Sequence, residues 1–136
     1  MARQTRPAPR APARKLRSLK VTDAFKSFVL DQLEELGDVT ARSMFGGVGL
    51  YHRGVFFGLL ARDTLYLKVD ERTRSDYEDA GMTPFEPYPG RRRSERGGTM
   101  RYYSVPLEVL ESPLDLAVWA REAVAAATAD ASRGKP

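Results

Sequence analysis

The chain contains no cysteine and only one histidine, His52. Without cysteine it can form neither a disulfide framework nor a thiolate metal site. Nucleophilic triads and most zinc sites need imidazole as base or ligand, so a lone histidine leaves only carboxylate-rich designs. His52 also stands at the end of an expected hairpin, where a solvated turn residue is common. We therefore expect no catalytic residue, no metal and no cofactor in this protein.

Long apolar runs are missing as well. No stretch approaches the roughly 18 consecutive apolar residues that a membrane-spanning helix needs, and the first residues lack the apolar core of a secretory signal. The absence of cysteine also fits a reducing compartment. These absences predict a cytoplasmic protein with no membrane contact.

Acidic residues are missing from the first twenty residues, which carry seven of the 22 basic side chains. Subtracting them leaves 15 basic and 18 acidic side chains in residues 21–136, a net charge of −3. Three prolines prevent a continuous helix, and only Leu16 and Leu19 are large and apolar. We predict that residues 1–20 form a disordered basic tail. The alternative is an organelle transit peptide, whose amphipathic helix and serine content are lacking here. The basic residues of the tail are Arg3, Arg6, Arg10, Arg14, Lys15, Arg17 and Lys20.

Apolar side chains at helical spacing predict helices at both ends of the remaining chain. The first covers residues 22–36, with Thr22 or Asp23 as cap and Gly37 after its end. The second begins at Pro113 behind Ser112 and runs to about Ala129. Shorter helices are expected at residues 72–80 and 106–111. The inner face of the last helix would consist of Leu116, Trp119, Ala120, Ala123 and Ala127.

Between the helices the apolar period falls to two, which is typical of half-buried strands. We predict strands at residues 39–45, 48–52, 55–60, 64–69 and 100–105, and a further one near Phe85. Gly46 and Gly47 would separate the first two strands, and the short turns imply an antiparallel meander. The sequence thus predicts a single α+β domain at residues 21–130, with helices packed on a meander sheet and a frayed end at 131–136.

Two motifs invite a chemical interpretation. Gly46, Gly47 and Gly49 suggest a phosphate-binding loop, but a strand follows them and no lysine completes the motif, so a sharp bend in a hairpin is favoured. Five carboxylates could support acid–base catalysis or hold a cation. They surround a short polar helix, so a solvated face is favoured over this enzyme alternative. They are Asp70, Glu71, Asp76, Glu78 and Asp79.

A second basic cluster lies in the Pro- and Gly-rich segment before the last strand. Its arginines are Arg91, Arg92, Arg93 and Arg96, followed by Arg101. Tyr88, Tyr102 and Tyr103 are close in sequence, and arginine with interleaved aromatics suits phosphate contact and base stacking. A loop kept soluble by its charge is the alternative. Together with the tail, this cluster indicates nucleic acid as a second class of partner. We assign Phe45, Phe57 and Trp119 to the core.

The stretch from Arg42 to Tyr51, R-S-M-F-G-G-V-G-L-Y, is followed by L-Y-L-K-V at residues 65–69 and M-R-Y-Y-S-V-P at 100–106. As a set these segments resemble the N-terminal domain of the TfoX/Sxy family of bacterial competence regulators, over residues ~22 to ~128. Residues that match as binding surface or as fold signature are Arg42, Met44, Phe45, Gly46, Gly47, Gly49, Tyr51, Lys68, Tyr102 and Tyr103.

The resemblance implies an α+β domain similar in architecture to secretion chaperones, with no catalytic activity. It also implies a regulator of transcription that works through a protein partner. Two-domain members carry a second, helical domain, and this sequence ends at Pro136, so we expect a stand-alone domain. The sequence leaves open whether this domain binds DNA itself or only contacts a DNA-bound protein.

Overall fold

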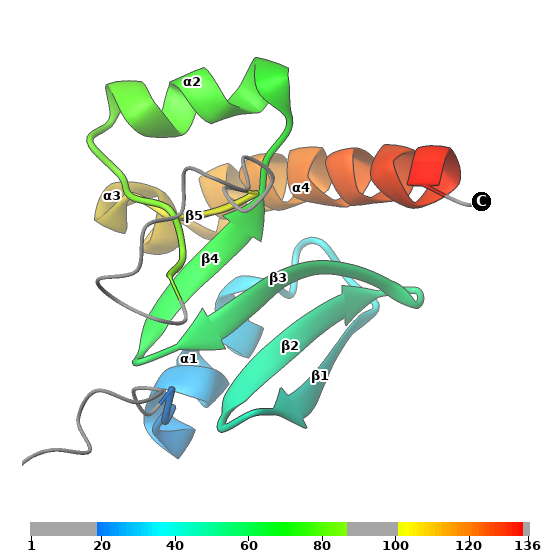
Figure 1. Cartoon of the computed structure of the whole chain (residues 1–136). Coiled ribbons are helices and arrows are strands. Elements are labelled where there is room, and N and C mark those ends of the chain that lie inside the picture. Colours follow the sequence, from blue (N-terminus) through cyan, green and yellow to red (C-terminus); the bar gives the residue numbers. More distant parts are fainter. Residues whose placement is uncertain (1–18, 87–100, 135–136) are drawn as a thin grey trace, which may run out of the picture.

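The computed structural model describes residues 19–86 and 101–134. Five strands form one antiparallel sheet in chain order, each paired with the next (Figure 1). They are β1 (Val39–Met44), β2 (Gly47–His52), β3 (Val55–Ala61), β4 (Thr64–Lys68) and β5 (Tyr102–Ser104). The α+β class and the meander are therefore confirmed. The extra strand expected near Phe85 is reduced to a single bridge between Pro84 and Tyr103.

Four helices complete the described fold: α1 (Asp23–Gln32), α2 (Glu71–Asp79), α3 (Leu107–Leu110) and α4 (Pro113–Gly134). Thr22 caps α1 by accepting a hydrogen bond from the Phe25 N–H at 3.1 Å. This helix ends earlier than the predicted residue 36, and Gly37 follows in the left-handed region at φ 79°. At the other end α4 continues to Gly134, beyond the predicted end at Ala129 and into the segment expected to fray.

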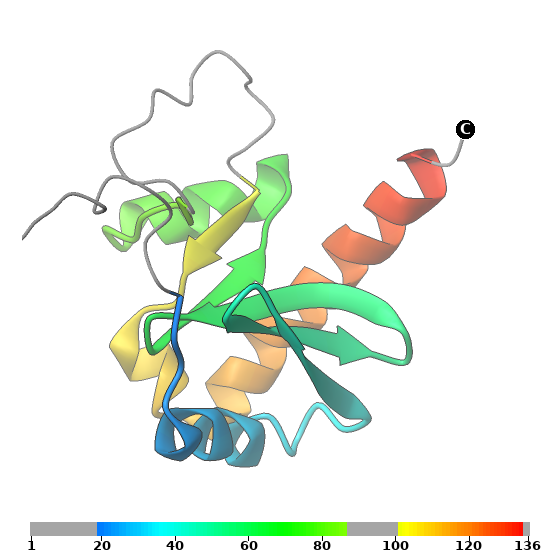
Figure 2. The same ribbon diagram turned by 60° about the horizontal axis from the view of Figure 1, so that its bottom comes forward.

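The core lies on one face of the sheet, where α1, α3 and α4 gather (Figure 2). The predicted strand alternation places Leu65, Leu67 and Val69 in it, together with the fully buried Phe57. Alanines on the inner face of α4 are buried as expected, and their small size lets the helix approach the strands closely. Burial of these apolar side chains supplies the main driving force for folding.

The opposite face of the sheet, here called the outer face, carries a smaller apolar cluster. Leu19, Leu59, Ala61 and Tyr66 are buried in it, and Phe56, Phe85 and Tyr102 pack against them. Leu19 is only 8 % exposed, and its carbonyl accepts a hydrogen bond from the Arg62 N–H at 3.2 Å. Leu19 was predicted in the tail, yet it belongs to the folded unit. Its side chain packs beside Gly47, which has no side chain to occupy that space.

The remaining predictions about the tail, its basic residues up to Arg17, and Arg91, Arg92, Arg93 and Arg96 lie outside the described residues. Within those residues, none of the helices combines the length and apolarity that crossing a membrane requires.

Candidate functional site

The segment from Arg42 to Tyr51 forms the β1–β2 hairpin. Its turn is Phe45–Gly46, with φ of 49° and 87°, so both residues are left-handed and Met44 pairs with Gly47. Such a turn matches the twist of the flanking strands. The predicted break at Gly46–Gly47 is thus displaced by one residue, and Gly47 belongs to β2. A Cβ on Gly47 would lie 2.7 Å from the Leu60 carbonyl oxygen, which explains why glycine stands there.

Phe45 lies at the tip of this hairpin. It was predicted in the core, and this prediction is wrong, because its side chain is 84 % exposed. Exposure forfeits the burial of an aromatic ring, and the left-handed backbone costs a non-glycine residue about 1–2 kcal/mol. The turn therefore carries two local penalties at one residue.

Every other non-glycine residue with positive φ in the described part of the chain has a polar partner. Asp38 and Arg53 form an ion pair at 2.9 Å. Asp63 accepts hydrogen bonds from the Thr22 N–H at 2.8 Å and from its hydroxyl at 3.0 Å. Arg62 Nη2 donates to the Glu86 carbonyl oxygen at 3.1 Å. Phe45 has no polar side-chain group that could compensate its conformation in this way.

Behind the tip, the side chains of Met44 and Phe56 both pack over Gly49. A Cβ on Gly49 would lie 3.0 Å from Phe56 Cε1 and 3.1 Å from Met44 Sδ. The glycine therefore leaves room for the side chains of Met44 on β1 and Phe56 on β3, which both approach it. Three of the motif glycines are explained by the fold: Gly46 by its left-handed backbone, and Gly47 and Gly49 by close approach.

Aromatic and basic side chains then continue in a row over the outer face. The Arg42 guanidinium lies 5.5 Å from the Tyr51 ring centre, within the range of a cation–π contact. Tyr51 packs on Phe56 at 5.2 Å, and Phe56 on Tyr102 at 5.7 Å between ring centres. Lys68 Nζ closes the row at 5.3 Å from the Tyr102 ring centre. We call these residues the outer row.

The far end of the outer row is neutralised by α4. Asp130 accepts from Lys68 Nζ at 2.7 Å and from Arg101 at 2.8 Å. Burial, and secondarily the Asp130 charge, raises the pKa of Tyr102 to about 12. Lys68 is only 7 % exposed, so this end is a packed ion-pair site. The opposite end, around Arg42 and Phe45, is open to solvent.

The structure therefore divides the motif residues into two groups. Gly46, Gly47, Gly49, Lys68 and Tyr102 serve the fold or its packing. Tyr103 points to the core side, where its hydroxyl donates to Glu78 at 2.8 Å. Arg42 and Phe45 remain exposed, with half-buried Met44 and Tyr51 beside them. We refer to these four residues as the hairpin surface.

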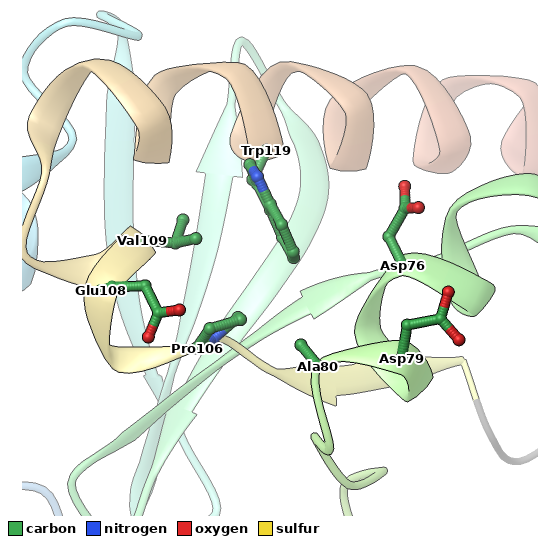
Figure 3. Close-up of a pocket in the computed structure, with 7 residues that line it drawn as sticks. All are labelled: Asp76, Asp79, Ala80, Pro106, Glu108, Val109 and Trp119. Atoms are coloured by element: carbon green, nitrogen blue, oxygen red, sulfur yellow. The ribbon is translucent and has the colours of Figure 1, made fainter.

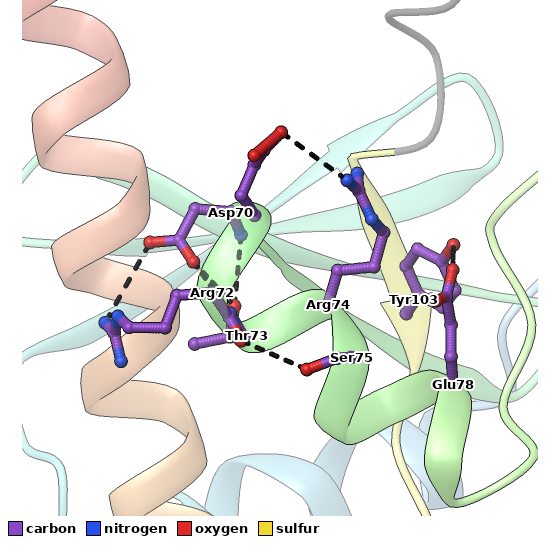
Figure 4. A network of polar contacts seen from close by, with 8 residues as sticks. Asp70, Arg72, Thr73, Arg74, Ser75, Glu78 and Tyr103 are labelled. Carbon is purple, nitrogen blue, oxygen red and sulfur yellow. Dashed lines mark hydrogen bonds and ion pairs between the residues drawn. The ribbon is translucent and has the colours of Figure 1, made fainter.

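The acidic stretch has structural roles along α2 (Figure 4). Asp70 caps the helix, accepting from the Thr73 N–H at 2.9 Å, while the Thr73 hydroxyl accepts from the Asp70 N–H. The hydrogen bond from the Thr73 N–H to the Asp70 carboxylate is the main reason why the pKa of Asp70 is lowered from its ordinary value. Glu71 forms a long ion pair of 3.8 Å with Arg74. The Glu78 carboxylate accepts a hydrogen bond from the Tyr103 hydroxyl. Asp70, Glu71 and Glu78 therefore each have a different partner.

A shallow pocket of about 380 Å³ lies between α2, α3 and α4 (Figure 3). Asp76, Asp79 and Glu108 line it, around Trp119. Trp119 was predicted in the core; it is half-buried and packs edge-on against Tyr77 at 4.7 Å between ring centres. Of the five carboxylates of the enzyme alternative, Asp76 and Asp79 line this pocket, whereas Asp70, Glu71 and Glu78 do not. In residues 19–86 and 101–134 no three His, Cys, Asp or Glu side chains are grouped to hold a metal ion.

His52 has a structural role instead of being a solvated turn residue. It is half-buried on β2, and its Nδ1 lies 2.9 Å from the Gly37 carbonyl oxygen. A carbonyl oxygen only accepts, so Nδ1 carries the proton in this contact. His52 thereby ties β2 to the end of the first helical segment.

Sequence reasoning missed Leu19, Phe56 and Asp130 as parts of the outer face. Phe56 and Phe57 face opposite sides, as adjacent residues of a strand do, and the register shift between Leu50 and Tyr51 places Leu60, not Leu59, on the core side with Phe57. The adjacent aromatics were a signal that could have been used. Asp130 gave no such signal, since 62 residues separate it from Lys68.

Comparison with known proteins gives one finding. A model of the family described as the TfoX N-terminal domain matches residues 31–127, which include the β1–β2 hairpin and the outer row up to α4. No curated protein matches the chain.

Proposed function

This chain belongs to the TfoX N-terminal domain family, and from that premise we propose that it is a non-enzymatic adaptor domain. It acts in the cytoplasm and regulates transcription by contacting a partner protein through the hairpin surface. The partner is a component or a regulator of the transcription machinery. No substrate, metal or cofactor takes part.

The observation that carries this proposal is the exposure of Phe45 at a left-handed position. Strained conformations persist where the surrounding structure enforces them, and they concentrate at functional sites. Aromatic side chains also dominate the affinity of protein interfaces, where a partner pocket can desolvate them. A partner that buries Phe45 recovers the apolar burial that the free domain forgoes.

The charge near Phe45 points to the kind of partner surface. Arg42 is exposed and stacks on the Tyr51 ring, with no carboxylate partner among the described residues. Arginine stacked on an aromatic ring keeps its hydrogen-bonding fork free for a carboxylate. We therefore expect an acidic group beside the partner's pocket for Phe45.

Site-specific crosslinking tests this function. A photoreactive phenylalanine analogue is placed at position 45 in the full chain, and crosslinked proteins are identified from cells. Leu114 on α4, which is 67 % exposed, provides the matched control position away from the hairpin surface. We expect one specific transcription-related protein from position 45 and none from position 114.

Phe45→Ala should abolish that contact and change the transcripts that the protein controls, while Leu114→Ala should not. Both variants must retain the thermal unfolding midpoint of the wild-type chain or exceed it. Wild-type transcript levels in a folded Phe45→Ala strain would refute the proposal.

Direct nucleic-acid binding is a second candidate, and one observation favours it. The described residues carry 11 basic and 17 acidic side chains, whereas residues 1–18 and 87–100 are basic. Leu19, Phe85 and Tyr102, which adjoin those two segments, lie in the same outer-face cluster. The described residues next to both basic segments thus lie on one face of the sheet, which suits a shared contact of the two segments with phosphates.

Fluorescence anisotropy of a labelled random-sequence duplex tests this candidate. Full-length protein is compared with residues 19–136, because a shorter fragment would lose the buried Leu19. Binding through the tail should weaken with salt by about 0.9 log units per log unit for each phosphate neutralised, and it should fall in the truncated protein. Equal binding by both forms would remove the tail from the mechanism.

A further inference from the structure

The two edges of the sheet differ in how they are covered. At β5 the Phe85 N–H donates to the Tyr102 carbonyl oxygen at 2.8 Å, and the Ser104 N–H to the Thr83 carbonyl oxygen at 2.9 Å. That edge is closed by residues 83–85. At the other edge β1 pairs with β2 and, within the described part of the chain, with no second strand.

The hairpin register shows which backbone groups point outward from β1. In a two-residue turn the closing residues Met44 and Gly47 form a hydrogen-bonded pair, and hydrogen-bonded and non-hydrogen-bonded pairs then alternate. The alternation reaches Asp38, whose carbonyl oxygen accepts from the Arg53 N–H at 3.4 Å. The N–H and C=O groups of Val39, Ala41 and Ser43 therefore face away from the sheet.

This edge lacks several of the features that usually prevent strand pairing. β1 contains no proline and no lysine, and its register with β2 runs without a bulge. Its single charged residue, Arg42, lies over the Tyr51 ring of β2 and so leans away from the open edge. A regular strand of six residues is thus presented to another chain.

We propose that this edge binds a second copy of the chain by antiparallel β1–β1 pairing centred on Ala41. The register is self-complementary: Ala41 faces Ala41, and Val39 faces Ser43, so the outward-facing groups meet as hydrogen-bonded pairs. Thr40 faces Arg42, so no like charges stand directly opposite each other. Phe45 would come to lie across from Gly37, whose missing Cβ faces open space with no atom within 4 Å.

The product is a continuous ten-stranded sheet that carries two hairpin surfaces, twice the five strands of one chain. An edge pair of this length buries little area, so association is weak and depends on protein concentration. This inference goes beyond the proposed function, because it concerns backbone groups of β1 and stands even if Phe45 binds nothing.

Amide hydrogen exchange measured by NMR on the full chain tests the pairing, at about 10 µM and about 1 mM to bracket a weak interface. At both concentrations the amides of Thr40 and Arg42 are protected by β2. The amides of Ala41 and Ser43 should exchange freely when dilute and slow by about tenfold when concentrated. Sedimentation velocity should show the monomer converting to a dimer over the same range.

Ser43→Pro removes one outward N–H and leaves the bonds to β2 intact, as proline permits on an edge strand. This variant should stay monomeric and lose the protection of Ala41, while its spectrum away from β1 is unchanged. Ser43→Thr keeps the N–H and should still pair. Free exchange of Ala41 and Ser43 at about 1 mM with a monomeric mass would overturn the proposal, and so would a Ser43→Pro variant that remains dimeric.

Discussion

The Phe45–Gly46 and Arg62–Asp63 turns place residues in the same left-handed region, with opposite side-chain chemistry. At the second turn both side chains bond to the protein: Asp63 to Thr22, and Arg62 to the Glu86 carbonyl. At the first turn the side chain is apolar and faces solvent. Contacts within the fold thus account for the Arg62–Asp63 turn, whereas at the Phe45–Gly46 turn the Phe45 side chain is left exposed.

The strongest way to break this comparison is to remove the glycine that follows the Phe45 turn. Gly47→Val places a side chain against the Leu60 carbonyl oxygen, 2.7 Å from the new Cβ. We expect the free energy of unfolding to fall by about 3 kcal/mol, since the backbone of β3 must move. Urea denaturation provides the measurement.

Gly54→Ala is the control for that substitution. Unlike Gly47, Gly54 has a positive φ, of 86°, and a Cβ there meets no atom within 4 Å. It should cost only the left-handed strain of about 1 kcal/mol. Equal losses in the two variants would show that the close approach at Gly47 is unimportant.

Disrupting the Arg62–Asp63 turn should lower the free energy of unfolding by less than Gly47→Val does. Asp63→Ala removes both acceptor contacts to Thr22, at 2.8 and 3.0 Å, and with them the anchor at the start of α1. The expected loss is about 1–2 kcal/mol of unfolding free energy, again by urea denaturation. Asp63→Asn keeps an acceptor oxygen and tolerates the left-handed region, so it should lose less. Wild-type stability of Asp63→Ala would contradict the comparison.

At the Phe45–Gly46 turn, a substitution should raise the free energy of unfolding instead of lowering it. Phe45→Asn replaces an exposed aromatic with a residue that favours left-handed turns, so the free energy of unfolding should rise by about 0.5–1 kcal/mol. In a pull-down, the variant should also fail to retain the partner that was identified by crosslinking from position 45. A stability gain with loss of partner is the signature of a residue kept for binding. If the variant is less stable than wild type, Phe45 supports the fold and the comparison fails.

The smallest effect is expected at the turn between β2 and β3, which contains Arg53. The side chains of Arg53 and Asp38 are 73 % and 59 % exposed, and such a pair contributes little in water. Arg53→Ala should change the free energy of unfolding by less than about 0.5 kcal/mol. The change should vanish at high salt, where exposed charges are screened. Measuring it in low and high salt separates the ion pair from the backbone strain, which alanine and arginine share.

The sequence predicted the meander and the core on sound physical grounds. Alternation at Leu65, Leu67 and Val69 and helical spacing in α4 each report directly on a buried face. Phe45 was misplaced because two turns, Phe45–Gly46 and Gly46–Gly47, are both compatible with the local sequence. A shift of one residue decides whether Phe45 continues the strand or leaves it. The observed register places Gly47 where the Leu60 carbonyl oxygen of β3 comes close, and local sequence does not encode that approach.

The position of Leu19 has a consequence for binding strength. Its backbone nitrogen lies 3.9 Å from where a Cβ of Gly46 would be, so the basic tail begins beside the hairpin tip. Six basic residues precede Leu19 in the sequence, so a partner bound at Phe45 under the proposed function would share one molecule with them. Two binding sites on one molecule raise each other's effective concentration when a partner can reach both. If the partner sits on DNA, two individually weak attachments combine into one with high avidity.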